Sequence, residues 1–463
     1  MSRVPTHTVP RPSAGGSRGR LVSPSSRHGV GTTLRVADAS VRRWEDYRAI
    51  APEAVIDEAL QLGRSLRGAR VLHINATAFG GGVAELLDSE IGLLRDAGVD
   101  AEWCLLCPDA ELFEITKRIH NGMQGKHVEL TKRDIEVYLE HNRHCAGMVG
   151  EEWDLIVVHD PQPAGLIEWA RAPATRWIWR CHIDTSAPDP AVWRLLDPFI
   201  ASYDRVVFTL DSFRPADIAP ARAVAIAPAI DPLAIKNAPL EASHVRGIVA
   251  ATGIDPSRPL MLQVSRFDPW KDPLGVIEAW RLARGHIEGL QLALVGSMAD
   301  DDPEGLEIYE TVRATSAKDD DCHVLTNREG IGALEVNALQ RHADVAVQKS
   351  LREGFGLTVS EALWKGTPVV GGDAGGIPMQ IGAGEAGILV NSVEACADAV
   401  VTLLRDTELA RALGQAGHER VRRDYLMPRL ARDDLALYAQ TLAASTDRTE
   451  NHTYSRFPLR RSP

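Results

Sequence analysis

Short apolar runs alternate with longer amphipathic stretches through the central part of the chain. Most of the short runs are continuously apolar, which is typical of strands that helices cover on both faces of a parallel sheet. The pattern therefore predicts an α/β fold assembled from βαβ units. The expected strands are 70–76, 101–106, 155–159, 177–181, 206–210, 224–227, 260–264, 291–295, 323–326, 345–348, 368–370 and 388–390.

One stretch interrupts this alternation. Residues 231–245 contain Pro232, Asn237 and Pro239, and we expect them to form a linker. The chain is then two doubly wound, Rossmann-like domains that face each other across a cleft. We assign 33–237 to the N-terminal domain and 238–430 to the C-terminal domain.

The two ends of the chain differ from its centre. Residues 1–32 carry arginines, serines, prolines and glycines but no acidic residue, so we expect a disordered basic tail. Residues 431–446 are expected to form a C-terminal helix, and its return to the N-terminal domain is left open. A second disordered tail is expected at 447–463.

The charge and the distribution of apolar residues narrow the kinds of partner that the protein can bind. The 463 residues carry a formal net charge of −12, which disfavours a general nucleic-acid partner because phosphate contacts need a basic face. The apolar runs are too short for a membrane span, and the first residues lack an apolar leader core. We therefore expect a cytoplasmic protein that binds small molecules, and a homodimer is left open.

Doubly wound sheets bind ligands beyond the carboxyl ends of their strands, so the strand-to-loop junctions are the places to look for chemistry. At the first junction, Asn75 is followed by the glycines Gly80, Gly81 and Gly82 and then by a helical stretch. Such a turn brings backbone N–H groups to an anion, but it matches neither G-x-G-x-x-G nor a Walker loop. A tight structural turn is the alternative.

At a later junction, Arg266 and Lys271 follow an apolar strand. Two cations at the mouth of a cleft can hold a diphosphate and stabilise the charge that develops as it departs. The alternative is a pair of surface cations neutralised by Asp268 and Asp272.

A third junction contains Glu353 in a glycine-rich loop and Glu361 in the next helix. Carboxylates accept hydrogen bonds from sugar hydroxyls, so two of them suit a nucleotide-sugar donor. The stretch 358–361 also reads Thr-Val-Ser-Glu, a capping box in which Glu361 would only satisfy a backbone N–H. Both roles are left open.

Two neighbouring strands of the first half also end in polar clusters. One cluster holds His159, Asp160 and Gln162, and the other holds His182 and Asp184. Such groups suit sugar recognition, and a histidine beside an aspartate can manage protons near neutral pH.

Metal chemistry is not required by the sequence. The acidic triplets 300–302 and 319–321 contain D-x-D, but both lie in acid-rich, turn-prone loops and are expected to be solvated. Cys104 and Cys107 form a lone C-x-x-C within a strand, where alternation separates the thiols, so inert cysteines are expected.

Taken together, these motifs resemble the retaining glycosyltransferases of family 4, which have the GT-B fold. The Glu353-to-Glu361 spacing matches that family's paired-glutamate motif, and Arg266 with Lys271 matches its diphosphate clamp. The likeness is closer still to the trehalose glycosyltransferring synthases. It covers roughly residues 35–440.

The resemblance implies transfer of glucose from a nucleoside-diphosphate glucose to glucose, giving α,α-trehalose with retention at the anomeric carbon. No tightly bound cofactor is implied, and Mg²⁺ is not required. Related acceptors (a sugar phosphate, a lipid or a glucan) and a non-catalytic sugar-nucleotide sensor remain alternatives.

The resemblance also implies residue roles. Arg266 and Lys271 would hold the diphosphate, with the Gly81–Gly82 turn on its other side, and Glu361 would bind the ribose. The implied contacts to the donor glucose are Glu353, Gly354, Phe355, Gly356 and Leu357. His182 and Asp184 would lie near the reacting sugar, and the implied acceptor contacts are Asp160, Gln162 and Asn75.

Overall fold

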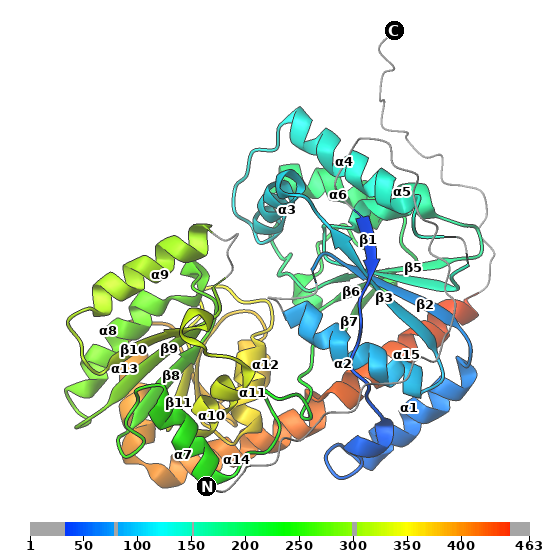
Figure 1. Ribbon diagram of the computed structural model, residues 1–463. Helices are drawn as coiled ribbons and strands as arrows, with labels where there is room; N and C mark the ends of the chain where they lie inside the picture. The colour runs from blue at the N-terminus through cyan, green and yellow to red at the C-terminus, as the bar shows by residue number, and fades with distance from the viewer. Residues whose placement is uncertain (1–32, 78–81, 151, 299–302, 445–463) are drawn as a thin grey trace, which may run out of the picture.

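The computed structural model describes residues 33–77, 82–150, 152–298 and 303–444 (Figure 1). They form two lobes, each with a central sheet between layers of helices. The N-terminal sheet has seven strands in the order β1-β3-β2-β4-β5-β6-β7, and the C-terminal sheet has six in the order β10-β9-β8-β11-β12-β13. The predicted α/β architecture with two doubly wound units is confirmed. The expected tails at 1–32 and 447–463 lie outside the described residues.

The strands of the N-terminal lobe follow the apolar runs closely. They are β1 (Thr33–Val36), β2 (Arg70–Asn75), β3 (Asp100–Cys107), β4 (Leu155–His159), β5 (Arg176–Cys181), β6 (Arg205–Phe208) and β7 (Ala223–Ala225). All are parallel except β1, an unpredicted edge strand that pairs antiparallel with β3. With four residues and a partly exposed Val36, β1 is too short and too open to produce a clear apolar run.

Helices cover both faces of this sheet. They are η1 (Trp44–Tyr47), α1 (Glu53–Ser65), α2 (Gly82–Asp96), α3 (Ala110–Met123), α4 (Lys132–Ala146), η2 (Ala164–Leu166), α5 (Ile167–Ala170), α6 (Pro190–Ile200), η3 (Asp211–Phe213) and η4 (Pro220–Arg222). Residues of α3, α4 and α6 share one core with the sheet, and residues of α1 and α2 share the core on its other face.

The C-terminal lobe repeats this plan with parallel strands only. Its strands are β8 (Leu260–Val264), β9 (Gln291–Gly296), β10 (Cys322–Thr326), β11 (Val345–Gln348), β12 (Val369–Gly372) and β13 (Gly387–Val390). Its helices are α7 (Ala242–Ala251), η5 (Pro269–Lys271), α8 (Pro273–Arg284), α9 (Pro303–Ser316), η6 (Asn327–Glu329), α10 (Ala333–His342), α11 (Leu357–Trp364), α12 (Ile377–Ile381), α13 (Val393–Arg405) and α14 (Thr407–Asp424).

Strand β8 shows why these runs are continuously apolar. Met261 packs into the core on one face of the sheet, whereas Leu260 and Leu262 pack into the core on the other. Because successive side chains point to opposite faces, a strand that is covered on both faces is apolar at nearly every position. The exception in β8 is the buried Gln263, whose side chain donates to the Lys271 carbonyl at 2.8 Å.

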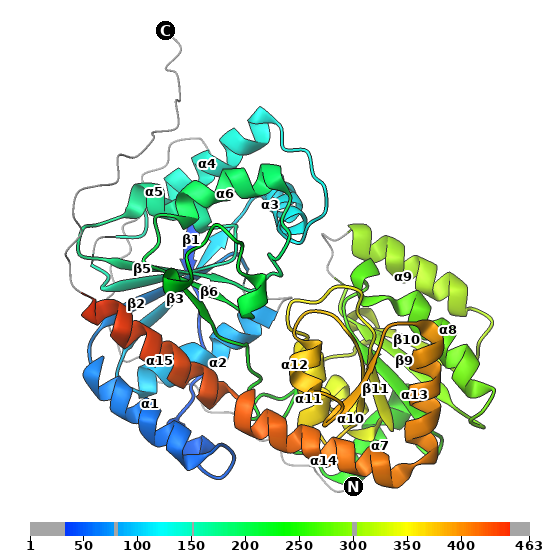
Figure 2. The ribbon, with the colours of Figure 1, turned by 180° about the vertical axis from the view of Figure 1, so that it is seen from behind.

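The last helix, α15 (Met427–Ala443), leaves the C-terminal lobe and packs against α1 and α2 of the N-terminal lobe (Figure 2). The crossing comes at Leu426, slightly before the boundary at residue 430 that the sequence indicated. There Ile230 and Leu426 form a parallel bridge, so the chain crosses between the lobes at two adjacent points. None of the described helices is long and apolar enough to span a membrane.

The expectation of a single linker at 231–245 is wrong at both ends. Asp231 is buried and accepts hydrogen bonds from Tyr47, Ser89 and Arg42, which fix it to the N-terminal lobe. At the other end, α7 already begins at Ala242. Pro232 and Pro239 therefore lie in a short, ordered turn between the lobes and not in a loose linker.

Candidate active site

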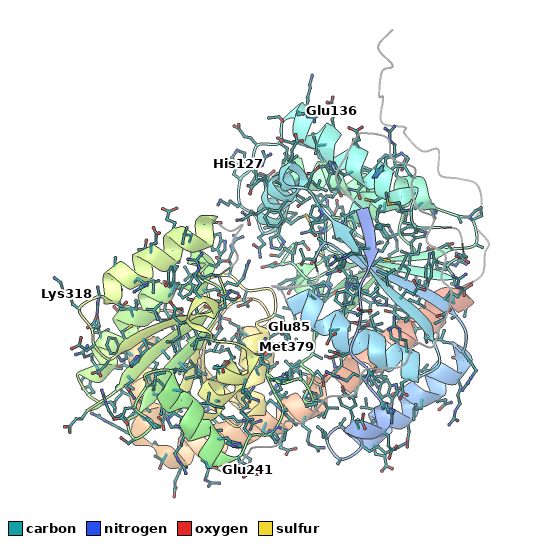
Figure 3. All side chains as sticks on the ribbon, viewed as in Figure 1. Glu85, His127, Glu136, Glu241, Lys318 and Met379 are labelled. Carbon is teal, nitrogen blue, oxygen red and sulfur yellow. The ribbon has the colours of Figure 1, made fainter. Side chains whose placement is uncertain are left out.

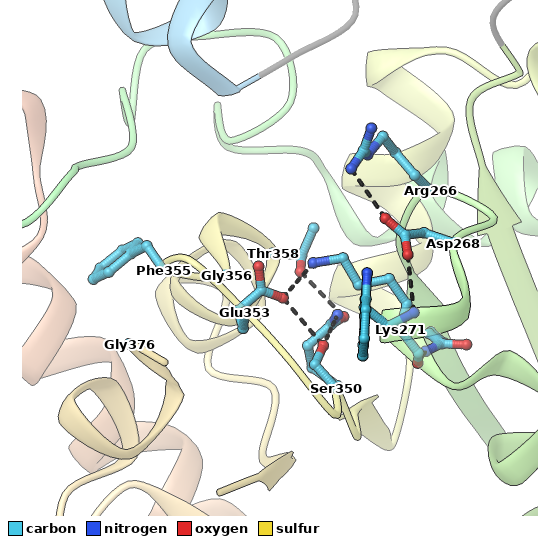
Figure 4. Close-up of polar contacts among 12 residues, drawn as sticks. Arg266, Asp268, Lys271, Ser350, Glu353, Phe355, Gly356, Thr358 and Gly376 are labelled. Carbon is cyan, nitrogen blue, oxygen red and sulfur yellow. Dashed lines mark hydrogen bonds and ion pairs between the residues drawn. The ribbon is translucent and has the colours of Figure 1, made fainter. Parts of the chain in front are cut away.

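The two candidate cations, Arg266 and Lys271, lie at the carboxyl end of β8 (Figure 4). Lys271 ends the short helix η5, and its Nζ is 2.6 Å from Oε2 of Glu353. The hydroxyl of Ser350 donates to the same carboxylate oxygen at 3.1 Å. The structure thus brings together two residues that sequence reasoning assigned to different parts of one donor sugar nucleotide.

Arg266 is more exposed, with 58% of its side chain accessible. It pairs with Asp268 at 3.1 Å, and Asp268 also accepts from the Trp270 N–H and so caps η5. Burial and then the charge of Arg266 lower the pKa of His120 on α3 to about 4, which places Arg266 opposite the N-terminal lobe.

The idea that neighbouring aspartates neutralise both cations holds for Arg266 and is wrong for Lys271. Asp272 turns away, pairs with the buried Lys349 and accepts from the Gly275 N–H at the start of α8. Lys271 is left to Glu353, and this pair is largely buried, with 15% and 9% of the two side chains exposed.

The loop from Glu353 to Leu357 packs closely against the backbone of Gly375 and Gly376. A Cβ at Gly375 would lie 1.8 Å from the Glu353 carbonyl oxygen, and one at Gly376 would lie 2.7 Å from the ring of Phe355. Gly356 has φ +85° and precedes α11, where a side chain would be strained. Gln380 donates to the Phe355 carbonyl at 2.6 Å and holds the loop in this shape.

Glu361 lies buried on α11, and its role as a capping residue is ruled out. The helix begins at Leu357 after Gly356 and has no side-chain cap, so Thr358 is already helical. Oε2 of Glu361 accepts from Gln340 at 3.2 Å, and Oε1 is 3.4 Å from Nζ of Lys236.

The charge on Glu361 is maintained despite its burial. Burial alone would raise its pKa, but Lys236 and Lys365 outweigh that effect and lower the pKa below its ordinary value. Lys236 also contacts both oxygens of Glu85 on α2 at 2.7 Å, so it bridges the two lobes. In Figure 3, Glu85 lies at the end of α2 that faces the C-terminal lobe.

The two lobes meet at two points that involve candidate residues. A Cβ at Gly354 would lie 2.9 Å from the carbonyl oxygen of His182, and a Cβ at Gly82 would lie 2.8 Å from Leu357. A pocket on the Leu357 side is lined from both lobes, by Glu85 and Leu86 of one and by Leu357 and Glu361 of the other. Gly354 lets its backbone approach that of His182, and Gly82 leaves room for the Leu357 side chain. Gly81 lies outside the described residues.

On the N-terminal side, Asp160 positions His182. Asp160 has φ +63°, and its carboxylate accepts from the backbone N–H of His182 at 2.8 Å. Burial raises the pKa of Asp160 to about 7, while the His182 N–H and Arg180 pull it down. His182 is therefore fixed at the end of β5, beside the Gly354 loop of the other lobe.

The remaining candidate residues of this lobe differ in whether their side chains already make hydrogen bonds within the protein. Asp184 accepts from the Ser186 N–H at 3.0 Å and closes a local turn after β5, while Gln162, in the loop after β4, is half-buried. Asn75 accepts from the Trp103 indole and donates to the Thr77 carbonyl, both at 2.7 Å. Asn75 therefore shapes its own turn, and a direct acceptor contact stays a prediction.

Within the described part of the chain, no cluster of His, Cys, Asp or Glu could hold a metal ion. Asp319 is not the solvated acid that the sequence suggested, because Arg281 and Arg284 bind it at 2.7 Å and 2.9 Å. The triplet 300–302 lies outside the described residues. Cys104, Cys145, Cys181 and Cys396 are buried thiols that form no disulfide.

Sequence reasoning missed several residues of this site. Lys236 is a lone lysine between turn residues, and nothing local indicates that it reaches Glu361. His73 gave a usable signal, because a histidine within an otherwise apolar, buried strand needs a polar partner.

Comparisons with known proteins agree with this architecture. Residues 73–215 match the family described as trehalose synthase, N-terminal domain, and residues 247–420 match glycosyl transferases group 1. The chain is 50% identical over 403 residues to a trehalose synthase of Rubrobacter xylanophilus, covering 86% of this chain and 96% of that protein. It is 42% identical over 388 residues to a trehalose synthase of Pyrococcus horikoshii, covering 83% and 93%.

A solved structure shows the same fold. The α,α-trehalose 6-phosphate synthase of Burkholderia multivorans superposes with a TM-score of 0.65 at 17% identity, covering 81% of this chain and 99% of that chain. Two facing doubly wound lobes, together with the match to glycosyl transferases group 1, define a GT-B glycosyltransferase. Within that class, the chain belongs to the trehalose synthase family.

Proposed function

We propose that this glycosyltransferase transfers glucose from a nucleoside-diphosphate glucose to free glucose and forms α,α-trehalose. The contact between Lys271 and Glu353, beside Arg266 and opposite His182, carries the proposal. It joins a diphosphate-binding cation to a sugar-binding carboxylate at the point where the lobes meet. Glu361, charged and buried farther along the same lobe, is proposed to accept the ribose hydroxyls.

In the proposed reaction, the bond between the glucose C1 and the β-phosphate oxygen breaks while the acceptor oxygen bonds to C1. Arg266 and Lys271 neutralise the charge that develops on the departing diphosphate. The acceptor proton passes to a phosphate oxygen on the same face, so the α-configuration is retained without a protein nucleophile. Glu353, released by Lys271, accepts hydrogen bonds from the donor glucose.

The proposal of a neutral acceptor is supported by what the nearby basic residues do. Arg180 is buried and bound to both oxygens of Asp434, at 2.6 Å and 2.8 Å. Arg118 is bound to Asp134 at 2.6 Å. The Arg180 guanidinium is therefore not available for a phosphorylated acceptor, whereas His182, Asp160 and Gln162 offer groups suited to hydroxyls.

The same two cations make a resident metal unnecessary in this proposal. Arg266 and Lys271 supply the positive charge that a metal would otherwise bring to the diphosphate. We expect turnover to survive exhaustive treatment with EDTA, provided that no divalent cation is supplied with the substrate.

The test is to incubate the full chain with UDP-, ADP- or GDP-glucose and ¹³C-labelled glucose, and to identify the disaccharide by NMR. We expect α,α-trehalose from at least one donor, with a single α-anomeric chemical shift for its two equivalent halves and the ¹³C label in the half that comes from the acceptor. A parallel reaction with glucose 6-phosphate addresses the phosphorylated acceptor. Trehalose phosphate without trehalose, or no disaccharide from any donor, would overturn the proposal.

A further inference from the structure

A row of four aromatic side chains runs beneath the acceptor side of the junction. The hydroxyl of Tyr438 lies 3.3 Å from Nε2 of His73, and Nδ1 of His73 lies 3.1 Å from Nε2 of His159. Nδ1 of His159 then lies 3.0 Å from Nε2 of His182. The His73 and His159 rings are stacked, as are those of His159 and His182, with centroids 5.3 Å apart in both pairs.

The sheet order assembles this row. Strands β2, β4 and β5 are neighbours, so His73, His159 and His182 reach one another although they are far apart in the chain. Tyr438 comes from α15, which packs on the same face of the sheet. The row therefore connects the helix that returns from the C-terminal lobe to the residue that faces Gly354.

Each imidazole in the row is neutral. Burial, reinforced by Arg180, lowers the pKa of His73 to about 3 and lowers the pKa of His182 well below its usual value. Burial and the neighbouring rings do the same for His159. A neutral imidazole has one N–H and one lone pair, so in a continuous row every N–H must point the same way.

The hydroxyl of Tyr438 sets the direction in which the hydrogen bonds of the row are donated. Among the described residues, His73 is the only hydrogen-bond partner of the Tyr438 hydroxyl, and both oxygens of Asp434 on the same helix already accept from Arg180. A buried donor without an acceptor is costly, so this hydroxyl donates to Nε2 of His73. The direction then follows along the row: His73 donates from Nδ1 to His159, and His159 donates from Nδ1 to His182.

This order leaves one N–H at the end of the row. Nε2 of His182 accepts from His159, so the proton of His182 is on Nδ1. Within the described ranges, Nδ1 of His182 makes no hydrogen bond, and the residue is half-buried where the lobes meet.

We propose that Tyr438, His73 and His159 are positioning residues that hold His182 as a hydrogen-bond donor to a sugar oxygen at the lobe junction. His182 is then not a general base, because its only free nitrogen already carries a proton. The inference rests on the proposed function only in taking the ligand beside His182 to be a sugar.

The first test reads the tautomers directly and needs no substrate. Long-range ¹H–¹⁵N spectra of the full chain labelled with ¹⁵N-histidine distinguish an Nδ1–H ring from an Nε2–H ring. We expect Nδ1–H for His73, His159 and His182, assigned with single His→Gln variants. Nε2–H tautomers at these positions would overturn the proposed direction.

The second test compares two tyrosines that each lose a buried hydroxyl. Tyr438→Phe removes the start of the row, whereas Tyr203→Phe removes a 2.8 Å bond to the Ala164 carbonyl far from it. We expect similar drops in melting temperature, with kcat falling about threefold to tenfold in Tyr438→Phe only, at unchanged KM for the donor. Mixed tautomers at His182 should accompany that fall.

Equal turnover in the two variants would overturn the positioning role. The failures of the two proposals are distinguishable. If no donor yields trehalose, the proposed function falls, while the tautomers measured without substrate still decide the direction of the row.

Discussion

The two sides of the lobe junction present their polar groups in opposite states. On the N-terminal side, the groups are buried and joined in series, as in the row from Tyr438 to His182. On the C-terminal side, they are charged and paired one to one, with Lys271 on Glu353 and a more exposed Arg266 on Asp268.

This difference indicates a division of labour. Neutral groups that are held in place by hydrogen bonds to one another keep their geometry when a ligand arrives, which suits recognition of sugar hydroxyls. Ion pairs near solvent contribute little to stability, so the exposed Arg266 can exchange Asp268 for a diphosphate at small cost. The Lys271–Glu353 pair is largely buried, so its exchange requires a new partner for each charge, which a diphosphate and the sugar hydroxyls would supply. The N-terminal side is thus preorganised, and the C-terminal side is built to change partners.

Breaking the buried ion pair beneath the row tests the preorganised side. Asp434→Ala leaves the Arg180 guanidinium buried and uncompensated, so the free energy of unfolding should fall by about 3–5 kcal/mol in urea titrations. Glu58→Ala removes a more exposed pair between Arg432 of the same helix and α1, and it should cost less than about 1 kcal/mol. Equal losses would mean that burial does not distinguish the two pairs.

Removing a cation tests the exchangeable side. Lys271→Ala should lower kcat by about 10²–10³-fold, because the departing diphosphate loses a charged partner, and the melting temperature should also fall because the buried Glu353 loses its cation. Lys318→Ala is the matched control, since Lys318 is exposed on the outer surface of the C-terminal lobe (Figure 3). Steady-state rates of disaccharide formation measure both variants. Normal turnover in folded Lys271→Ala would remove this residue from the diphosphate site.

Glu361 lies between these extremes, because it is both buried and charged. Glu361→Gln keeps the shape but loses the charge, so KM for the donor should rise about tenfold with kcat nearly unchanged. Initial rates and calorimetric titration with the nucleoside diphosphate measure the effect. An unchanged donor affinity with a lower melting temperature would show that Glu361 only holds Lys236 in place.

The last comparison concerns Lys365, whose pKa burial lowers to about 7. Above that pH, the unfolded chain still holds a proton that the folded protein has lost, so this lysine makes unfolding harder as pH rises toward 10. Wild type should therefore gain stability relative to Lys365→Met between pH 7 and pH 10. Denaturation curves that shift in parallel across this range would contradict the assigned environment.

The sequence predicted the strands and the positions of most candidate residues, since both depend on local pattern. It left Glu361 undecided, because Thr358 and Glu361 have the spacing of a capping box wherever the helix begins. The start at Leu357 is set by the turn at Gly356 and its packing against the loop of Gly375 and Gly376. The capping role of Glu361 was therefore excluded by packing between segments that are distant in the chain, which the local motif does not encode.

By itself, the sequence determined which residues stand at strand ends, because apolar runs and glycines act over a few positions. Only the tertiary structure decided which side chains are in contact: Lys271 with Glu353, Lys236 with Glu361, and Tyr438 with His73. Partner choice depends on strand order, on helix α15 crossing back and on the approach of the lobes. Those are long-range properties, and a buried charge or imidazole takes its chemistry from the neighbours that they provide.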